Sequence, residues 1–516
     1  MILLNVLATL LFFPLYLAIR WPYFKLPIGP DTGYYVSNHT IVHRKFSFSR
    51  GWNARYAMCS KFLPECFLSM IYLKYGHKKY NFAWRFAFSL YNYLTAISVG
   101  LLAHAATQAE PVSYLAGLVS YGLISSEPDY GIYYESSEQF EILFQTSGTY
   151  FILLGMQTAD PLFSIIGAGL WFVDVFLIKI TGIVSAGPLL IGLLVYTPAV
   201  LPYIAIEFLI FLSFYLGLFI KSNKNPLEVI KTELGHQAHY SRYEAGEVKV
   251  AHGLMIQLFN KLKMIKRILT GNPFIPLVAF LGLVWSLGNI AGITQLFLFL
   301  YLLGIILKLC VSFLPMWWYQ IPLLPTIALF SSFALIDLAS KGLPGEVLIG
   351  LFLAAWLYLN VRRVQKMNVE QLNQYTWKIH PEMGILHSDL QKIVQDIRGI
   401  INKDSLLVYG YPSFCAMAGQ SYDINFLTAI SYMDSMNPNW NIELHANMVK
   451  NPPSYIFDML PHYAFDPEAV YENLGLHYQR IKSWRGNWGT YNLYQFLQQI
   501  ALDRPNPDFR SLVGAR

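Results

Sequence analysis

The chain has 516 residues, of which 55% are hydrophobic and only 13% are charged, and its formal net charge is +6. Its mean hydropathy is +0.39. Soluble domains carry about 25% charged residues, so this composition excludes an ordinary soluble globular protein and predicts an integral membrane protein. The alternating pattern of a membrane β-barrel is absent, so the spans are predicted to be helices.

Apolar runs long enough to cross a bilayer of about 30 Å begin with Leu3–Ile19 and recur as far as Leu357, and we count about eleven. The first run lacks a basic n-region and a small-residue cleavage site, so we interpret it as a span rather than a signal peptide. The cysteines show neither close pairing nor metal-ligand spacing, which indicates no disulfide framework and no zinc site. They are Cys59, Cys66, Cys310 and Cys415.

A long basic and aromatic loop is expected after the first span, from residue 20 to about residue 85. It includes the stretch Pro30–Tyr35, of sequence PDTGYY, which places Asp31 just outside the apolar run. A lone carboxylate in a loop commonly caps a helix or pairs with a nearby lysine. Here the carboxylate is followed by many Arg and Lys residues that suit an anion, so Asp31 is the first candidate for an active-site acid.

Further spans are expected at Phe86–Ala106 and Val112–Ser125, the second of which is short. The chain is then expected to surface as an acidic segment, residues 126–141, which leads into a span at Ile142–Met156. Glu138 would therefore stand at the mouth of a helix. Helix capping, ion pairing and a role in a site are all open for it.

Two more spans precede one at Tyr203–Ile220, and Lys179 lies at or inside the end of one of them. A lysine in a membrane is costly unless it snorkels to the interface or is paired. Lys179 is therefore either an interface anchor, which the snorkelling argument favours, or a functional cation. A polar excursion over residues 221–271 follows, with an amphipathic helix expected in its second half. Two of its histidines have a spacing that one metal could share, but no third ligand accompanies them.

The last third of the chain changes character. Residues 361–516 are soluble in composition, which predicts a separate domain of mixed helix and strand type. Residues 404–410 are predicted to form a turn and a strand, and residues 364–375 and 386–402 to form helices. The predicted architecture is a polytopic α-helical membrane module, residues 1–360, followed by this soluble α/β domain. Four last spans of the membrane module are expected near residues 274–287, 293–314, 318–339 and 347–359.

Motifs of soluble catalysis are missing from the chain. It contains no phosphate-cradling loop of the Walker type, no dinucleotide glycine fingerprint, no HExxH and no Gly-x-Ser-x-Gly elbow. We also find no internal symmetry of the kind that many transporters show between their two halves. Many spans, carboxylates in the loops and a terminal soluble domain favour an enzyme whose substrate is a lipid.

Several short stretches carry a resemblance to a known family. Pro30–Tyr35 is similar to an acidic motif in the family's first loop, and Lys61–Pro64 to a lysine followed by prolines before the next span. Ser137–Phe140 is similar to a signature at a later helix mouth, and Trp318–Pro325 to a tyrosine-to-proline run that opens a late span. These stretches occur in the same order as in the family. The chain therefore resembles the GT-C membrane glycosyltransferases, in particular the branch with the protein O-mannosyltransferases and the lipid A aminoarabinose transferase. Stretches 407–410, 418–420 and 451–458 resemble the strand-rich module of its bacterial members.

The resemblance implies a GT-C fold and a sugar transfer from a polyprenyl-phosphate donor, in one displacement with inversion. It implies that Asp31 acts as general base or orients the nucleophile, and that Glu138 is a second acid that binds sugar or acceptor. Lys61 is the first choice for a contact with the donor phosphate, joined by Arg44 and Arg55. The residues implied to line the substrate are Tyr34, Tyr35 and Tyr319.

The implied partners are the polyprenyl-phosphate sugar, membrane lipids and an acceptor that the sequence does not identify; nucleic acid is not among them. No cofactor is indicated, and a divalent metal is left open. The resemblance places Asp31 on the extracytoplasmic side, in the cell envelope of a bacterium or its equivalent, as it does the C-terminal domain. The distribution of charge favours the opposite orientation, because the outward orientation places most loop Lys and Arg residues outside, whereas loop Lys and Arg residues are usually cytoplasmic. We keep the outward orientation, since that rule weakens for long loops.

Two other classes of function stay open. One is a transporter or flippase of lipid-linked substrates, with Asp174 and Lys179 along the path of the substrate. The other is a non-catalytic subunit of a membrane complex that docks through its C-terminal domain.

Overall fold

The chain divides into two compact units, each described by itself below. The first contains the helices from α1 to α14, apart from residues 68–80 of α3, and the second contains α16 and a β-sheet. The computed structural model describes residues 2–21, 24, 62–107, 111–126, 137–221, 274–290, 292–311, 317–366, 387–401, 406–409, 448–458, 475–486 and 489–499.

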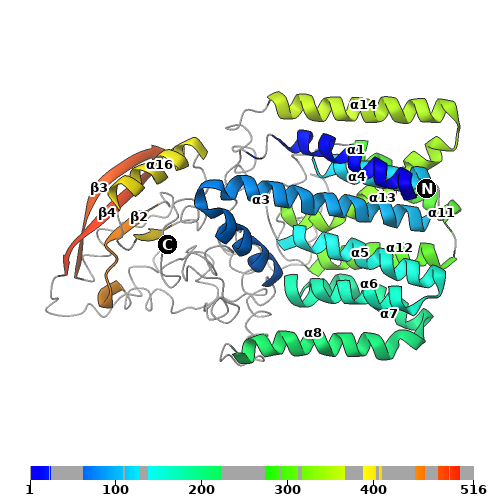
Figure 1. The fold of residues 1–516 in the computed structure, drawn as a ribbon, viewed down its shortest axis with the longest axis horizontal. Coiled ribbons are helices and arrows are strands. Elements are labelled where there is room, and N and C mark those ends of the chain that lie inside the picture. Colours follow the sequence, from blue (N-terminus) through cyan, green and yellow to red (C-terminus); the bar gives the residue numbers. More distant parts are fainter. Residues whose placement is uncertain are drawn as a thin grey trace, which may run out of the picture. The chain divides into compact units, whose positions relative to one another are not determined.

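The first unit is a bundle of long helices (Figure 1). Short irregular turns interrupt it at three places, namely a π-helical turn η6 and two 3-10 turns, η7 and η8. The elements in chain order are α1 (Ile2–Arg20), α3 (Phe62–Ala106), α4 (Pro111–Ile124), α5 (Ser137–Thr158), α6 (Pro161–Val173), η6 (Asp174–Ile178), α7 (Gly182–Tyr196), η7 (Pro198–Val200), α8 (Leu201–Lys221), α11 (Phe274–Asn289), α12 (Gly292–Val311), η8 (Trp317–Leu323), α13 (Leu324–Ala339) and α14 (Leu343–Lys366).

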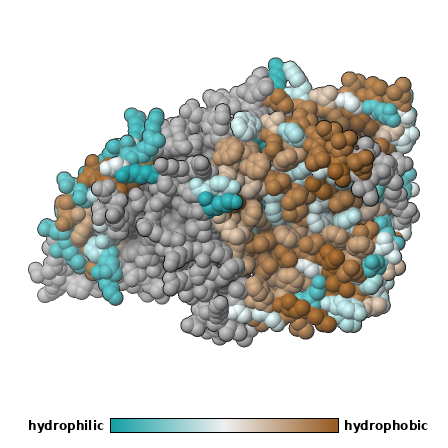
Figure 2. Space-filling view, in the orientation of Figure 1, coloured by the Kyte–Doolittle hydropathy of each residue, from teal (hydrophilic) through white to brown (hydrophobic). Residues whose placement is uncertain are grey.

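The surface of this unit is apolar. Figure 2 shows hydrophobic residues over most of the visible face of the helices. Within the described residues, five helices are long and apolar enough to cross a membrane, and five shorter helices are apolar as well. Large apolar side chains also point outward, for example Leu209 and Ile210 of α8, which are 57% and 61% exposed. The chain is therefore a helical membrane protein, and the total of about eleven spans stays a prediction.

Small residues set how closely the central helices approach. A Cβ atom built on Gly167 of α6 would lie 2.6 Å from the carbonyl oxygen of Gly148 of α5 and 2.6 Å from Cγ1 of Ile152. Such close contact is typical of helix pairs in membranes, where glycines let backbones meet. α5 thus lies tightly against α6, while α13 packs against both α4 and α11, and α12 packs against α7.

Two expected boundaries are corrected by the structure. The segment expected as a loop up to residue 85 is helical from Phe62, because α3 continues without a break from there to Ala106. The candidate span within α3 begins at Phe82, close to the expected Phe86. The aromatic residues that suggested a loop instead hold this helix in place. Trp84 is fully buried, and its ring packs against those of Phe67, Phe88 and Phe140.

The second correction concerns the acidic segment 126–141, which was expected to surface before a span at Ile142. The helix α5 begins five residues earlier, at Ser137, and its first residues are buried in the bundle. The acids can enter the apolar interior because lysines from other helices pair with them, as described below.

The second unit contains the helix α16 (His387–Ile400) and a four-stranded mixed sheet. The strand order is β1-β2-β4-β3, with β1 parallel to β2 and the other two pairs antiparallel. The helix buries one apolar face, formed by Ile393, Val394 and Ile397. The predicted helix near 386–402 and the predicted strand near 404–410 are confirmed by α16 and β1. The strands are β1 (Leu406–Tyr409), β2 (Tyr455–Asp458), β3 (Leu476–Gly486) and β4 (Gly489–Gln499).

A candidate active site at one end of the helix bundle

Most of the residues predicted for the site lie outside the described part of the chain. The exceptions are Glu138 and Tyr319. Glu138 is in the first turn of α5, and the backbone of Tyr319 forms part of η8. The predicted roles of the others stay predictions; they are Asp31, Tyr34, Tyr35, Arg44, Arg55 and Lys61. The polar excursion 221–271 likewise falls almost wholly outside the described residues.

The first two turns of α5 present an unusually polar face to the interior of the bundle. Glu138, Glu141 and Gln145 lie three and four residues apart, which places them along one side of a helix. Their exposed fractions are 2%, 0% and 0%. Ser137, the first residue of the helix, donates a long hydrogen bond of 3.4 Å to Oε2 of Glu138. Acids buried at this depth in a membrane protein require partners and mark a site by default.

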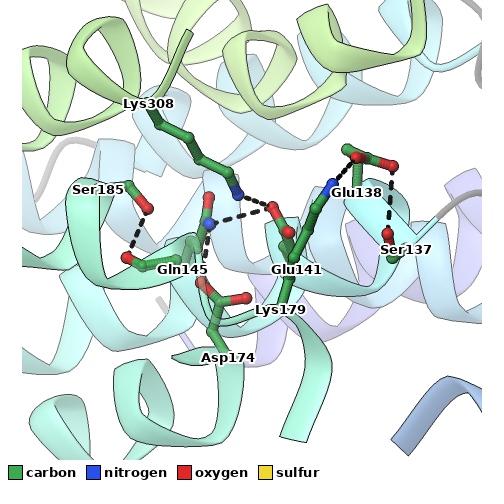
Figure 3. Close-up of polar contacts among 9 residues, drawn as sticks. Ser137, Glu138, Glu141, Gln145, Asp174, Lys179, Ser185 and Lys308 are labelled. Atoms are coloured by element: carbon green, nitrogen blue, oxygen red, sulfur yellow. Dashed lines mark hydrogen bonds and ion pairs between the residues drawn. The ribbon is translucent and has the colours of Figure 1, made fainter. Parts of the chain in front are cut away.

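Glu138 is paired with Lys179, whose Nζ donates to Oε1 of Glu138 in a buried ion pair. Lys179 directly follows the π-helical turn η6, and its backbone N–H donates to the carbonyl oxygen of Asp174 at 2.8 Å. Residues five apart in a regular α-helix point about 140° apart, and a π turn reduces this angle. The turn therefore lets Asp174 and Lys179 both face α5, as Figure 3 shows.

A second ion pair lies one helical turn further along α5. Nζ of Lys308, on α12, donates to Oε2 of Glu141. Beyond it, Nε2 of Gln145 donates to Oδ2 of Asp174 at 2.8 Å and lies 3.5 Å from Oε2 of Glu141. Lys308, from α12, and Asp174, from η6, both reach the polar face of α5 (Figure 3).

Gly182, at the start of α7, allows Asp174 to sit here. A Cβ atom at Gly182 would lie 2.7 Å from Oδ2 of Asp174, so any larger residue would push the carboxylate away. Ser185 of the same helix donates to the carbonyl oxygen of Gly182 at 2.8 Å. The start of α7 thus packs closely against this carboxylate and leaves no room there for a side chain.

The cluster contains three carboxyl groups but two ammonium groups, and each of these five side chains is at most 8% exposed as a residue. One oxygen each of Glu141, Gln145 and Asp174 has no hydrogen-bond donor among the described residues. Buried acceptors of this kind are normally satisfied by water, an ion or a ligand. The unsatisfied oxygens of the cluster are thus suited to bind groups that donate hydrogen bonds, such as hydroxyls. Its lysines are suited to bind an anion.

The end of the bundle to which Glu138 belongs is the one where α1 ends. Arg20, the last residue of α1, donates from Nε to Oγ of Ser89 at 3.2 Å and from Nη1 to the carbonyl oxygen of Ser125 at 2.9 Å. Two residues after Ser89, the hydroxyl of Tyr91 donates to the carbonyl oxygen of Phe140 at 2.5 Å. The last turn of α1 and the first turn of α5 therefore meet neighbouring residues of α3.

Sequence reasoning found only part of this cluster. Glu138 was predicted as a site acid, and Lys179 was identified as either an anchor or a functional cation. The structure shows it buried and paired, which corrects the snorkelling interpretation. Glu141, Gln145 and Lys308 were missed. The available signal for Lys308 was a lysine near the end of an otherwise apolar run, which is rare in membrane helices unless it is functional.

Within the described residues, no group of three or more His, Cys, Asp or Glu side chains could hold a metal ion.

Comparison with known proteins gives a fold match without a sequence match. Neither the protein-family profiles nor the curated protein sequences contain a match to this chain. Among solved structures, ArnT from Cupriavidus metallidurans bound to undecaprenyl phosphate is similar, with a TM-score of 0.57 and 14% identity over 96% of this chain and 97% of ArnT. The apo state of the same protein gives a TM-score of 0.53 and 12% identity over 93% and 97% of the two chains.

The chain therefore shares its overall fold with ArnT over nearly the whole length of both chains. Identities of 12% and 14% show the fold alone, so membership of the GT-C glycosyltransferases, and the branch within them, stays a prediction. The function is argued separately.

Proposed function

We propose that the protein is a membrane glycosyltransferase that moves a sugar from a polyprenyl-phosphate donor to an extracytoplasmic acceptor, with inversion. The observation that carries this proposal is the buried Glu138–Lys179 pair at one end of an ArnT-like bundle. A structural neighbour, ArnT, has been solved with undecaprenyl phosphate bound. The fold supports the binding of a lipid phosphate, and the pair supplies an acid, Glu138, that can bind a sugar.

In this proposal Asp31 is the base that receives the acceptor proton, and Lys61, Arg44 and Arg55 neutralise the departing phosphate. Glu138 accepts a hydrogen bond from a hydroxyl of the sugar or the acceptor. Lys179 holds the Glu138 carboxylate in one orientation, so that this hydrogen bond is formed without reorganisation.

A transporter or flippase of lipid-linked substrates is the second candidate, because charged residues gather inside the bundle. Against it, each carboxyl of the cluster is paired or hydrogen-bonded, and the space beside Asp174 is so small that a Cβ at Gly182 would lie 2.7 Å from its Oδ2. Such tight pairing suits a fixed site better than a path along which a substrate moves.

The proposal is tested with purified protein in two steps. Native mass spectrometry identifies the lipid that copurifies, and we expect a polyprenyl phosphate or its sugar conjugate. A set of undecaprenyl-phosphate sugars is then offered as donors, and release of undecaprenyl phosphate is followed for wild type and for Asp31→Asn, Glu138→Gln and Glu346→Gln. The last is a control, because Glu346 is an exposed acid at the start of α14.

We expect Asp31→Asn and Glu138→Gln each to lower turnover at least 100-fold, while Glu346→Gln matches wild type. Wild-type turnover by both site variants would reject the assigned site. Movement of the intact conjugate across liposomes, without release of undecaprenyl phosphate, would favour the transporter.

A further inference from the structure

The three acids of the α5 cluster have different main partners, although Nε2 of Gln145 also donates to Oε2 of Glu141 at 3.5 Å and Oγ of Ser137 donates to Oε2 of Glu138 at 3.4 Å. Glu138 is bound by Lys179, Glu141 by Lys308 and Asp174 by Gln145. The three partners come from different places in the sequence, because Lys179 follows η6, Lys308 is on α12 and Gln145 is on α5 itself. The division of partners is therefore a property of the folded bundle and not of one local motif.

Glu141 and Asp174 could each compete with Glu138 for the ammonium group of Lys179. Glu141 is one turn from Glu138 on the same face of α5, where two like charges repel each other and share neighbours. Asp174 is five residues before Lys179 and faces the same side, because of the π turn. Lys179 therefore has three carboxyl groups in its neighbourhood. Two of them would compete for its ammonium group if they lacked partners of their own.

We propose that Lys308 and Gln145 are positioning residues that reserve Lys179 for Glu138. Lys308 satisfies Glu141 with a charge of its own, and the amide of Gln145 gives Asp174 a neutral donor. Neither residue touches Glu138 in any described contact, so both act through Lys179. This inference rests on the proposed function for its catalytic meaning, since it assigns Glu138 to the site.

Two features of the cluster indicate that Lys308 and Gln145 keep Lys179 paired with Glu138, rather than only joining helices. Asp174 is satisfied by an amide rather than by a third lysine, which keeps the number of cations at two while the acids number three. In addition, Gly182 leaves the space that the Asp174 carboxylate occupies beside Gln145, since a Cβ there would lie 2.7 Å from its Oδ2. Asp174 can therefore meet Gln145 while Lys179 meets Glu138.

The test removes a positioning residue and then removes the competitor that it controls. Lys308→Met leaves Glu141 without its lysine, and we expect kcat to fall about 10- to 100-fold, because Lys179 is drawn toward Glu141. Lys308→Met with Glu141→Gln removes the competitor as well, and we expect kcat to return to within about threefold of wild type. The matched pair is Gln145→Leu and Gln145→Leu with Asp174→Asn, with a smaller fall and the same recovery. Lys308→Arg, which keeps the charge, should resemble wild type.

All variants are assayed as full-length protein in detergent, at saturating undecaprenyl-phosphate sugar, with kcat expressed per folded molecule after size-exclusion chromatography. The double variant is decisive because it lacks the Lys308–Glu141 ion pair as completely as Lys308→Met does, and differs from it only in the competing carboxylate. A double variant as slow as Lys308→Met would show that the ion pair acts only as a structural tie, and would overturn the positioning role. Should Lys308→Met not fold, the comparison of Gln145→Leu with its double variant decides the same question.

Failure of this inference is distinguishable from failure of the proposed function. Loss of transfer in Glu138→Gln together with unchanged kcat in Lys308→Met and Gln145→Leu would reject the positioning role alone. Full transfer by Glu138→Gln would reject both.

Discussion

Two helices of nearly equal length, α5 and α8, differ in composition and in how much of their surface is buried within the protein. α5 has 22 residues and α8 has 21. α8 is apolar except for Glu207 and the terminal Lys221, and only 17% of its spanning window is buried within the protein. α5 begins with serine and acids, does not reach the apolar composition of the spanning helices, and is buried along its polar face. Within the described part of the bundle, hydropathy identifies every helix except α5 as apolar, whether that helix is mostly buried, as α13 is, or mostly exposed, as α8 is.

The difference has a physical cause. Lipid tails are as apolar as leucine, so a helix such as α8 gains little by turning its side chains inward and needs only to avoid polar groups. A polar helix has no such freedom. The acids of α5 tolerate the interior only beside Lys179 and Lys308, so the sequence of α5 requires partners from η6 and α12. The predictions below test how far this contrast holds, from the largest effect to the smallest.

The largest expected effect is at the buried pair. We expect Lys179→Met to lower the free energy of unfolding by about 3 to 5 kcal/mol, because it leaves the buried carboxylate of Glu138 without its charged partner. The control is Lys341→Met, which removes an exposed pair with Asp337 in which the two side chains are 63% and 40% exposed. That change should cost less than about 1 kcal/mol. Denaturation in mixed micelles measures both, and equal effects would mean that burial does not matter here.

Packing should separate the two helices next. Leu153 of α5 is fully buried and Leu209 of α8 is 57% exposed. We expect Leu153→Ala to cost about 2 to 5 kcal/mol, because it leaves a cavity in the bundle. Leu209→Ala should change the free energy of unfolding by less than about 1 kcal/mol, since lipid fills the space. A cost at Leu209 as large as that at Leu153 would indicate that α8 is covered by protein.

Glycine substitutions test the same contrast at the backbone. Gly167→Ala on α6 should destabilise the bundle by about 1 to 3 kcal/mol, because the new methyl group would press on the backbone of α5. Gly217 of α8 has no atom within 4 Å of the position of an added Cβ, and alanine favours a helix. Gly217→Ala should therefore be neutral or stabilise by a few tenths of a kcal/mol. The result would contradict the contrast if both substitutions had the same sign.

The sequence predicted α8 more completely than α5. Tyr203–Ile220 was expected as a span and the helix covers Leu201–Lys221, because a continuous apolar run needs no knowledge of its neighbours. The start of α5 was placed five residues late, because Glu138 and Glu141 were interpreted as a surface segment. Only the fold brings Lys308 to Glu141, across 167 residues of sequence. The ArnT-like fold was accessible because the landmarks that predict it are short and ordered along the chain, whereas ion pairs between distant helices leave no local pattern.

The smallest effect is expected where an acid and a lysine meet in water. Asp396 of α16 accepts hydrogen bonds at Oδ2 from Nε1 of Trp484 at 2.8 Å and from Nζ of Lys482 at 2.9 Å. The side chains of Lys482 and Asp396 are 38% and 41% exposed. The hydrogen bond from Trp484, and after it that from Lys482, lower the pKa of Asp396 below its ordinary value.

A lowered pKa in the folded state has a definite sign. The stabilisation from these bonds is complete above the pKa of an unfolded aspartate, about 3.9, and is lost as the pH falls through the lower folded pKa. Asp396→Asn should therefore remove at most about 1 kcal/mol at pH 6 and progressively less below pH 4, because the pair is exposed and screened. Unfolding of the full-length protein between pH 3 and pH 6 measures this difference. An effect of Asp396→Asn that matched that of Lys179→Met, or that grew toward low pH, would show that burial is not what separates the acids of α5 from this one.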